Sequence, residues 1–401
     1  MLKGKTVLLG VSASIAAYKT CNLARMLTKL GADVYVAMTP NSLNFVHPLT
    51  FETLTQHKCL IDSFDRNFEY CVQHVSIAKK ADVVMIAPAT ANVIGKIAGG
   101  IADDMLTTTV MAATCKKIIA PAMNHNMYHN PIVQENIEKL KAHGYEIVEP
   151  VKGMLANRDI GDGKLPDEET LLEYIIREIA FEKDLAGKKI LVTAGATRES
   201  IDPVRFITNH SSGKMGFALA RAAMLRGADV TVIAAHTDAA PPMFVNVVPV
   251  QSAEEMFCAV KEHYKQQDFV IKAAAVADYT PASVSDRKIK KSDDDMSIPL
   301  RRTTDILNYI GHNKGEHQVI CGFSMETDNV IENSRKKLAS KNADMICANS
   351  LKTSGAGFGT DTNIITMITP DGDRELDIMP KFDAANIILT RLKEIQEEKI
   401  K

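Results

Sequence analysis

The chain has 401 residues, of which 46% are hydrophobic and 24% charged, and its formal net charge is −2. This length is typical of two or three globular domains, and the charge gives no support for a nucleic-acid or membrane partner, either of which usually requires a basic excess. We expect no membrane span and no signal peptide, since the apolar runs are too short. The seven cysteines form no CxxC pair, so we expect reduced thiols in a cytoplasmic protein.

The first half of the chain alternates the patterns of buried strands and amphipathic helices. Helical spacing of apolar residues covers 15–30, 92–98, 103–113 and 131–143. Continuous apolar runs predict strands at 6–11, 33–38, 82–88, 116–123 and 145–150. We therefore predict an α/β domain built on a doubly wound parallel sheet, with ligands bound beyond the carboxyl ends of its strands.

The same pattern begins again after a predicted helix at 167–182 and an expected linker, KDLAGKK. The stretch GKKILVTAGAT at 187–197 repeats the opening stretch GKTVLLGVSAS at 4–14. Further strands are predicted at 189–195, 229–235, 269–278, 319–327 and 344–350, with helices at 213–226 and 381–399 and a hairpin turning at Asp371–Gly372. We therefore predict two α/β domains, 1–186 and 187–401, each with its own strand–loop–helix site.

The first predicted site does not have the pattern of a dinucleotide site. GVSASIA lacks the spacing GxGxxG, and the second strand ends in Met38-Thr39-Pro40-Asn41-Ser42, where a dinucleotide site has an acidic residue. Hydroxyl groups near a helix N-terminus suit a phosphate monoester such as that of FMN. The same hydroxyls could instead only cap helices.

Two further stretches, APATAN at 87–92 and APAMNHNMYHNP at 120–131, each close a predicted strand. Parallel strands end at one edge of their sheet, so we expect both stretches to line the first site. His74 lies where a helix begins just before a central strand, and a lone histidine in such a place is compatible with a structural or a catalytic role.

Five stretches of the first half together resemble the flavin-dependent cysteine decarboxylases, which share PASANT-like and PxMNxxM motifs: GVSASIAAYK, LTFETL, HVSIAKKADVVMIAPATAN, GIADDMLTT and PAMNHNM. The resemblance implies a flavodoxin-like fold that binds FMN between the subunits of a trimer. It implies His74 as the active-site base and Asn124 as the residue that holds the substrate carboxylate. The FMN contacts that it implies are Gly10, Ser12, Thr39, Ala89, Thr90 and Asn92.

The second predicted site contains TNHSSGKMGFALA at 208–220, which is not a P-loop because Thr208 replaces the first glycine and Met215 follows the lysine. Its Ser-Ser-Gly turn at a helix N-terminus could still receive a phosphate, or could only cap the helix. Lys337 and Lys341 are spaced to share one helix face. The stretch DRKIKKSDDD by itself is typical of a solvated loop.

Taken together, stretches of the second half resemble phosphopantothenate–cysteine ligase: GKKILVTAGATRESIDPVRFITNHSSGKMG, AAAVADY, KIKK, KLASKNADMICAN and GFGTDTN. The ligase-like half follows the decarboxylase-like half, as in the bifunctional bacterial enzymes of coenzyme A synthesis. The resemblance implies that the second half is a Rossmann-like α/β domain with a β-hairpin. The implied reaction uses CTP and Mg²⁺ to join 4′-phosphopantothenate to L-cysteine through an acyl-cytidylate, and the decarboxylase then gives 4′-phosphopantetheine.

Within the ligase, the resemblance implies that Asn209 polarises the acyl-cytidylate and that Lys288 holds the triphosphate. The sequence does not identify the residues that hold the metal. The ligase half dimerises in the family, so a homo-oligomer, possibly a dodecamer, is the implied assembly. The implied CTP contacts are Ser212, Gly213, Ala273, Ala274, Ala275, Asp278, Lys288, Thr304, Asp305, Ile306, Leu307, Phe323, Lys337 and Lys341.

The stretch GMLANRDIGDGKLP at 153–166 departs from the family pattern, which has L-A-C-G with a proton-donating cysteine. This chain has Asn157 there, and an amide cannot serve as that acid near neutral pH. Either Asp159 or a water replaces the cysteine, or the reaction halts at an oxidised enethiol. A second alternative is a catalytically silent FMN-binding regulatory protein, which the presence of His74, Asn124, Asn209 and Lys288 disfavours.

Overall fold

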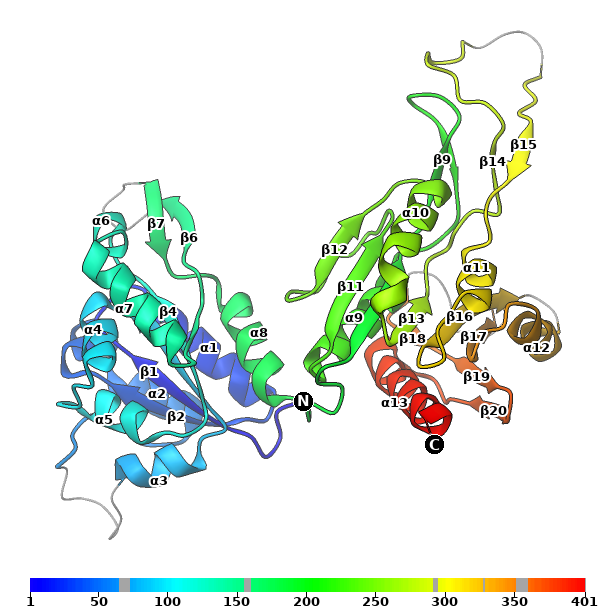
Figure 1. Cartoon of the computed structure of the whole chain (residues 1–401). Coiled ribbons are helices and arrows are strands. Elements are labelled where there is room, and N and C mark those ends of the chain that lie inside the picture. Colours follow the sequence, from blue (N-terminus) through cyan, green and yellow to red (C-terminus); the bar gives the residue numbers. More distant parts are fainter. Residues whose placement is uncertain (65–72, 155–159, 291–294, 327–328, 351–359, 401) are drawn as a thin grey trace. The chain divides into compact units, whose positions relative to one another are not determined.

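The computed structural model describes residues 1–64, 73–154, 160–290, 295–326, 329–350 and 360–400. Two predicted site residues, Asn157 and Asp159, lie outside the described residues. The chain divides into two compact units, Met1–Phe181 and Glu182–Lys401 (Figure 1). None of the helices in the described ranges is long and apolar enough to cross a membrane.

The first unit is built on a five-stranded sheet in the order β2-β1-β3-β4-β5, with every neighbouring pair parallel. This strand order is that of flavodoxin-like folds, so the predicted doubly wound sheet is confirmed. The interior strand β1 is buried along its whole length, which is why its sequence reads as a continuous apolar run. The strands are β1 (Thr6–Val11), β2 (Asp33–Met38), β3 (Val83–Ala89), β4 (Lys116–Pro121) and β5 (Glu146–Ile147).

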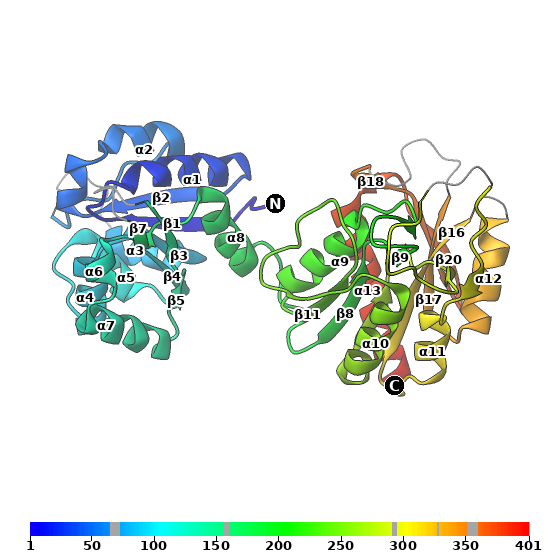
Figure 2. The same ribbon diagram turned by 90° about the horizontal axis from the view of Figure 1, so that it is seen from above.

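Helices cover both faces of this sheet (Figure 2). One face carries α1 (Ala17–Lys29), α2 (Pro48–Thr55) and α8 (Glu168–Ile179). The other face carries α3 (Gln73–Lys80), α4 (Ala91–Gly99), α5 (Met105–Ala112) and α7 (Pro131–Ala142). Their apolar stripes bury side chains such as Ile94 and Leu106 completely, and burying one such side chain stabilises the fold by about 1.5–3 kcal/mol. The remaining short helices are the 3₁₀ turn η1 (Pro40–Asn44) and α6 (His125–Tyr128).

A short hairpin of β6 (Val151–Met154) and β7 (Ile160–Lys164) follows β5. The sequence predicts a strand over 145–150, but β5 ends at Ile147, and Pro150, which has no N–H to donate to a ladder, stands just before the hairpin. The hairpin itself was not predicted, because IGDGK carries two glycines and no alternation of apolar residues.

The second unit is built on an eight-stranded sheet in the order β12-β11-β8-β13-β16-β17-β19-β20. Its first six strands are parallel, and their order is the 3-2-1-4-5-6 order of a Rossmann fold. The predicted hairpin is confirmed, since β19 and β20 pair antiparallel around Asp371–Gly372. The strands are β8 (Lys189–Ala194), β11 (Asp229–Ala234), β12 (Asn246–Pro249), β13 (Phe269–Lys272), β16 (Val319–Glu326), β17 (Met345–Ser350), β19 (Ile365–Thr369) and β20 (Gly372–Glu375).

Helices α9 (Lys214–Leu225) and α13 (Lys381–Ile400) pack on one face of the second sheet. The other face carries α10 (Ala253–His263), which continues into the 3₁₀ turn η2 (Tyr264–Gln266), α11 (Ile306–His312) and α12 (Val330–Ser340). Three small antiparallel pairs complete the unit: β9 (Arg198–Ser200) with β10 (Phe206–Thr208), β14 (Tyr279–Pro281) with β15 (Leu300–Arg302), and β18 (Thr362–Asn363) with β21 (Met379–Pro380).

Two expectations about the second half were wrong. The strand predicted over 269–278 ends at Lys272, because the next N–H groups leave the ladder: Ala274 N donates to Thr193 Oγ1 at 3.1 Å and Ala275 N to Gly195 O at 2.9 Å. The stretch KDLAGKK is not a free linker. Leu185 within it is fully buried, so this stretch is part of the second unit.

Candidate active sites

The first unit gathers the residues predicted to contact FMN at one edge of its sheet. Parallel pairing places Val11 opposite Met38, and Gly10 opposite Ile86, so β1, β2 and β3 end together. The structure therefore brings these six predicted residues to the same edge: Gly10, Ser12, Thr39, Ala89, Thr90 and Asn92.

Ser12 is buried and connects the end of β1 to the end of β3 through hydrogen bonds. Its hydroxyl is fully buried, donates to Pro88 O at 2.7 Å and accepts from Thr90 N at 3.0 Å. Its backbone N–H also donates to Pro88 O, at 3.3 Å. Both protons of Ser12 are thus used within the protein, so this residue positions the loop and has no proton left to donate to a phosphate.

Gly10 is required by packing. A Cβ added there would lie 2.6 Å from Leu106 Cδ1 and 3.2 Å from Ile86 Cγ1, so the absence of a side chain lets α5 pack directly on the sheet. This packing explains the glycine without any ligand.

Thr39 at the end of β2 has a property that a ligand would explain. Its side chain is 6% exposed, and its Oγ1 has no hydrogen-bond partner among the described residues. A buried hydroxyl without a partner costs about 1–3 kcal/mol. A phosphate or ribityl oxygen of FMN would supply that partner, so the edge formed by β1, β2 and β3 fits this cofactor.

A cavity of about 630 Å³ lies in the same unit, a size typical of small-molecule sites. Its walls come from the beginning of α1, the segment after β4 and the β6–β7 hairpin. The Lys19 ammonium ties two of these walls together, because it donates to Leu165 O and Pro166 O, each at 3.2 Å. The lining residues are Ser14, Ile15, Ala16, Tyr18, Lys19, Ala122, Met123, Asn124, Met154, Gly163, Lys164 and Leu165.

Ser14 and Lys164 are residues of this cavity that the sequence analysis missed. Ser14 accepts a hydrogen bond from Ala16 N at 3.3 Å, so its hydroxyl proton can still be donated to a ligand. The second hydroxyl residue of GVSAS was the signal that could have identified it. No local sequence pattern predicts that Lys164 lines the cavity, because its position in the wall depends on the β6–β7 hairpin.

Asn124 lies in the cavity wall and is oriented by the helix that follows it. Its side-chain oxygen caps α6 by accepting from Asn126 N at 2.9 Å. Because the oxygen is held by this bond, the amide group keeps its N–H donors for a ligand. A carboxylate is an appropriate acceptor for them.

His74 lies at the beginning of α3 and is partly buried. It is not among the described residues that line the cavity of Asn124. Helix α3 packs against α5, while α1, whose first turn contributes to the cavity, lies on the opposite face of the sheet. Within the described residues of one chain, His74 and Asn124 therefore do not line the same cavity.

In the second unit, three glycines let the chain pass closely from β8 to α9. Gly213 has φ +76°, and a Cβ there would lie 2.4 Å from Thr237 Cγ2. A Cβ at Gly216 would lie 2.7 Å from Ala194 Cβ. Gly195 also has a positive φ, +84°. The N-terminus of α9 thus lies over the end of β8, where Ser212 and Gly213 were predicted to meet CTP.

The residues predicted around the nucleoside lie at the ends of the neighbouring strands. Ala273, Ala274 and Ala275 follow β13, and Ala274 is buried. Asp278 is exposed, and its backbone carbonyl accepts a hydrogen bond from Thr303 N at 3.0 Å. This bond brings Thr304, the residue after Thr303, near Asp278.

A charged group joins α11 to α12. Lys337 Nζ donates to Phe323 O at 3.4 Å, and Lys341 Nζ lies 2.9 Å from Asp305 Oδ2. Burial acts to raise the pKa of Asp305, but a hydrogen bond from Asn308 N–H and the Lys341 ammonium together hold this pKa below its usual value. Lys341 is the C-cap of α12, and its backbone N–H donates to Lys337 O at 3.0 Å, so the two lysines lie one helical turn apart as their spacing predicts.

Ile306 and Leu307, which were also predicted to contact CTP, point into the core and are each 1% exposed. Only their backbone groups can reach a ligand. Because Asp305 caps α11 through Asn308 N at 2.9 Å, the helix begins at the position where these backbone groups are needed.

Lys272 is a charged residue of this region that the sequence analysis missed. It ends β13 and is partly buried. Burial and, next, the positive charge of Lys337 lower its pKa to about 8, while Asp305 and Asp278 act in the opposite direction. A single lysine inside the apolar run FVIKAAA was the signal that could have identified it.

Lys288 is exposed on the loop after β14. The loop is attached to the β9–β10 hairpin, since Ile289 N donates to Asp202 Oδ2 at 3.1 Å and Arg205 donates to Ile289 O at 3.0 Å. Asn209, also exposed, follows the same hairpin. The structure thus anchors the loop of Lys288 to the hairpin that precedes Asn209.

Comparison with known proteins connects both units to one family. The family model "Flavoprotein" matches residues 1–180, and the model "DNA/pantothenate metabolism flavoprotein C-terminal domain" matches residues 185–395. The coenzyme A biosynthesis bifunctional protein CoaBC of Bacillus subtilis is 47% identical over 402 residues, covering 99% of each chain. The chain belongs to this family. The CoaBC protein of Escherichia coli is 39% identical over 401 residues, again covering 99% of each chain.

Solved structures resemble each half of this family member separately. The C-terminal domain of a CoaBC protein is 44% identical and covers 53% of this chain and 97% of its own, with a TM-score of 0.46. The FMN-dependent cysteine decarboxylase SpaF is 36% identical and covers 42% of this chain and 93% of its own, with a TM-score of 0.38. The resemblance that the sequence motifs indicate is confirmed by the two full-length relatives.

Proposed function

We propose that this protein catalyses two consecutive steps of coenzyme A biosynthesis. The second unit joins L-cysteine to 4′-phosphopantothenate at the expense of CTP, and the first unit decarboxylates the product to 4′-phosphopantetheine. The observation that carries this proposal is the match to bifunctional CoaBC proteins over 99% of the chain. The fold agrees with it, because each unit has its own group of polar residues at the carboxyl edge of its own parallel sheet.

In the first unit we assign FMN to the edge where the Thr39 hydroxyl has no hydrogen-bond partner among the described residues. The flavin, when bound, supplies the oxidation of the substrate thiol that makes loss of CO₂ possible. Asn124 donates hydrogen bonds from its amide N–H groups to the substrate carboxylate. Lys19 and Lys164 line the same cavity with positive charge that suits the substrate phosphate. His74 takes up a proton as the base.

The separation of His74 from the cavity of Asn124 supports a site shared between subunits. A second copy of the chain would bring its own His74 to this cavity, as the trimer implied by the family resemblance requires. With a dimeric second unit, the assembly that we propose is a dodecamer.

In the second unit, the carboxylate of 4′-phosphopantothenate attacks the α-phosphate of CTP and pyrophosphate leaves. The amine of L-cysteine then displaces CMP from the acyl-cytidylate. We assign Asn209 to polarising the acyl group and Lys288, Lys337 and Lys341 to the triphosphate, where positioned positive charge stabilises the transferring phosphate. When bound with CTP, Mg²⁺ would offset part of the triphosphate's negative charge. We assign the other residues implied as CTP contacts to the same nucleotide, with Ile306 and Leu307 contributing only their backbone groups.

The test is mass spectrometry of the products formed from the full-length protein, CTP, Mg²⁺, 4′-phosphopantothenate and L-cysteine. We expect 4′-phosphopantetheine, because a ligase fused upstream of a dead-end product would have no use. A product lacking two hydrogens relative to 4′-phosphopantetheine, with the flavin left reduced, would contradict the full reaction. It would show that no group replaces the acid missing at Asn157 and would identify an oxidative decarboxylase.

A further inference from the structure

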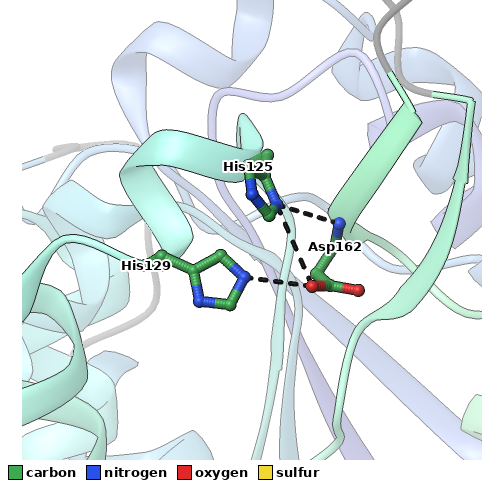
Figure 3. A group of neighbouring side chains, drawn as sticks. All are labelled: His125, His129 and Asp162. Carbon is green, nitrogen blue, oxygen red and sulfur yellow. Dashed lines mark hydrogen bonds and ion pairs between the residues drawn. The ribbon is translucent and has the colours of Figure 1, made fainter.

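Three side chains of the first unit, His125, His129 and Asp162, lie together outside the roles assigned above (Figure 3). His129 Nε2 is 3.0 Å from Asp162 Oδ2, and His125 Nδ1 is 3.9 Å from the same oxygen. One potential ligand atom from each residue lies within 4.8 Å of the others. His125 is the first residue of the short helix α6, His129 is its C-cap, and Asp162 comes from β7, so the group exists only because the hairpin lies against this helix.

We propose that His125, His129 and Asp162 bind one divalent transition-metal ion, with Zn²⁺ as the ion that this ligand set suits. Zinc takes imidazole nitrogens and carboxylate oxygens at about 2.0–2.2 Å, and open sites use three protein ligands with water in the fourth position. Ligand atoms around such an ion lie about 3–4 Å apart, so the present separations require only small side-chain rotations. The side chains are 42%, 49% and 37% exposed, in the order His125, His129, Asp162, so water can reach the open position.

The hydrogen bonds within the group hold the three side chains together and must open when an ion binds. The backbone N–H of Asp162 donates to His125 Nδ1 at 3.1 Å, which directs the lone pair of Nδ1 toward Asp162 and leaves the ring proton on Nε2. The ion must replace this bond, and it would also replace the close contact of His129 with the carboxylate. A set of two imidazoles and a single carboxylate disfavours Mg²⁺ and Ca²⁺, which prefer oxygen ligands.

Two glycines make the close approach of β7 to α6 possible. A Cβ at Gly161 would lie 2.8 Å from the His125 side chain, and one at Gly163 would lie 2.3 Å from Met123 O. Asn124 and Gly163, which line the cavity, are each next to a residue of the group in the chain. A bound ion would therefore fix one wall of the cavity to another. This inference rests on the geometry and does not depend on the proposed reaction.

The test is an isothermal calorimetric titration of the metal-free, full-length protein with Zn²⁺. Wild type and the control His143→Ala, which removes an exposed histidine of the same unit, should bind one ion per chain at this site. The variants His129→Ala and Asp162→Asn should bind it at least about tenfold more weakly, as expected when a ligand is lost. Zn²⁺ should raise the unfolding temperature of the wild type and not of these two variants.

Equal zinc affinity in the wild type, His129→Ala and Asp162→Asn would overturn the proposal. The absorption spectrum of the protein loaded with Co²⁺ is a second test. A thiolate-to-cobalt charge-transfer band would show that cysteines bind the ion and would overturn the proposal. Circular dichroism of each variant establishes whether it is folded. If His129→Ala does not fold, the near-isosteric variant Asp162→Asn still provides the test.

Discussion

The unpartnered hydroxyl of Thr39 is the residue whose chemistry most directly tests the flavin site. Thr39→Val keeps the shape of the side chain and removes the hydroxyl. We expect this variant to retain less flavin on purification, because the partner of the cofactor oxygen is gone. Without flavin it should be as stable as the wild type or more stable by about 1 kcal/mol, since a buried unsatisfied group is removed. Flavin content from absorbance and thermal unfolding of the apoprotein measure the two effects.

Thr39→Ser is the matched control, because it keeps the hydroxyl and should keep the flavin. If Thr39→Val binds flavin as tightly as the wild type, then Thr39 does not contact the cofactor.

Lys272 is the residue with the clearest dependence on pH. Its pKa of about 8 in the folded state lies below the 10.5 of an unperturbed lysine, so between these values the unfolded chain binds more protons than the folded chain. The free energy of unfolding should therefore rise with pH across this window, by at most about 1.4 kcal/mol per pH unit from this residue. Below pH 8 the folded state carries the buried charge, and the contribution stays unfavourable.

Lys272→Met should remove this dependence and raise the free energy of unfolding near pH 7. The measurement is denaturant unfolding of wild type and variant from pH 7 to 10.5, taken as a difference so that other titrating groups cancel. Parallel curves for the two proteins would show that Lys272 is not desolvated.

At the scale of elements, the start of α9 depends on a glycine that has both a left-handed backbone and no room for a side chain. Gly213→Ala should therefore destabilise the second unit by more than the roughly 1–3 kcal/mol that a left-handed conformation alone costs, because the new Cβ would meet Thr237. Gly187→Ala is the matched control: its φ is +78°, but nothing lies within 4 Å of the added Cβ. Denaturant unfolding should show the larger loss in Gly213→Ala, and equal losses would mean that the contact with Thr237 is relieved at no cost.

At the scale of the whole molecule, the two units should lose their activities independently. Lys288→Gln keeps the length of the side chain but removes its charge, so it should cut pyrophosphate release while leaving decarboxylation of preformed phosphopantothenoylcysteine unchanged. His74→Asn should do the reverse, with a loss of CO₂ release of about 100-fold or more and retained yellow colour. Pyrophosphate and CO₂ assays on both variants check this crossed pattern.

Full ligase activity in Lys288→Gln would contradict the proposed role of Lys288 and would indicate that its loop is only a solvated segment. Loss of both activities in either variant would mean that the two units do not work separately.

The sequence by itself determined the two α/β units, because their strands are buried on both faces and their helices carry one apolar stripe. Those patterns are local, so β1 and β2 occupy the residues predicted for them, and the helices end near Gly31 and Gly227, both of which adopt a positive φ. The motifs at the strand ends also carried the family resemblance, since the order of parallel strands brings them to one edge.

Only the tertiary structure decided what depends on contacts between distant segments. The β6–β7 hairpin has no apolar alternation to mark it, and without it neither the cavity wall at Lys164 nor the group of Asp162 with two histidines exists. The lowered pKa of Lys272 arises from burial and from Lys337, which is far away in the sequence. Ser12 is a brace and not a free donor because Pro88 and Thr90 fold back onto it. Burial, charge and hydrogen bonding at such positions depend on neighbours in space, and no local pattern of residues records them.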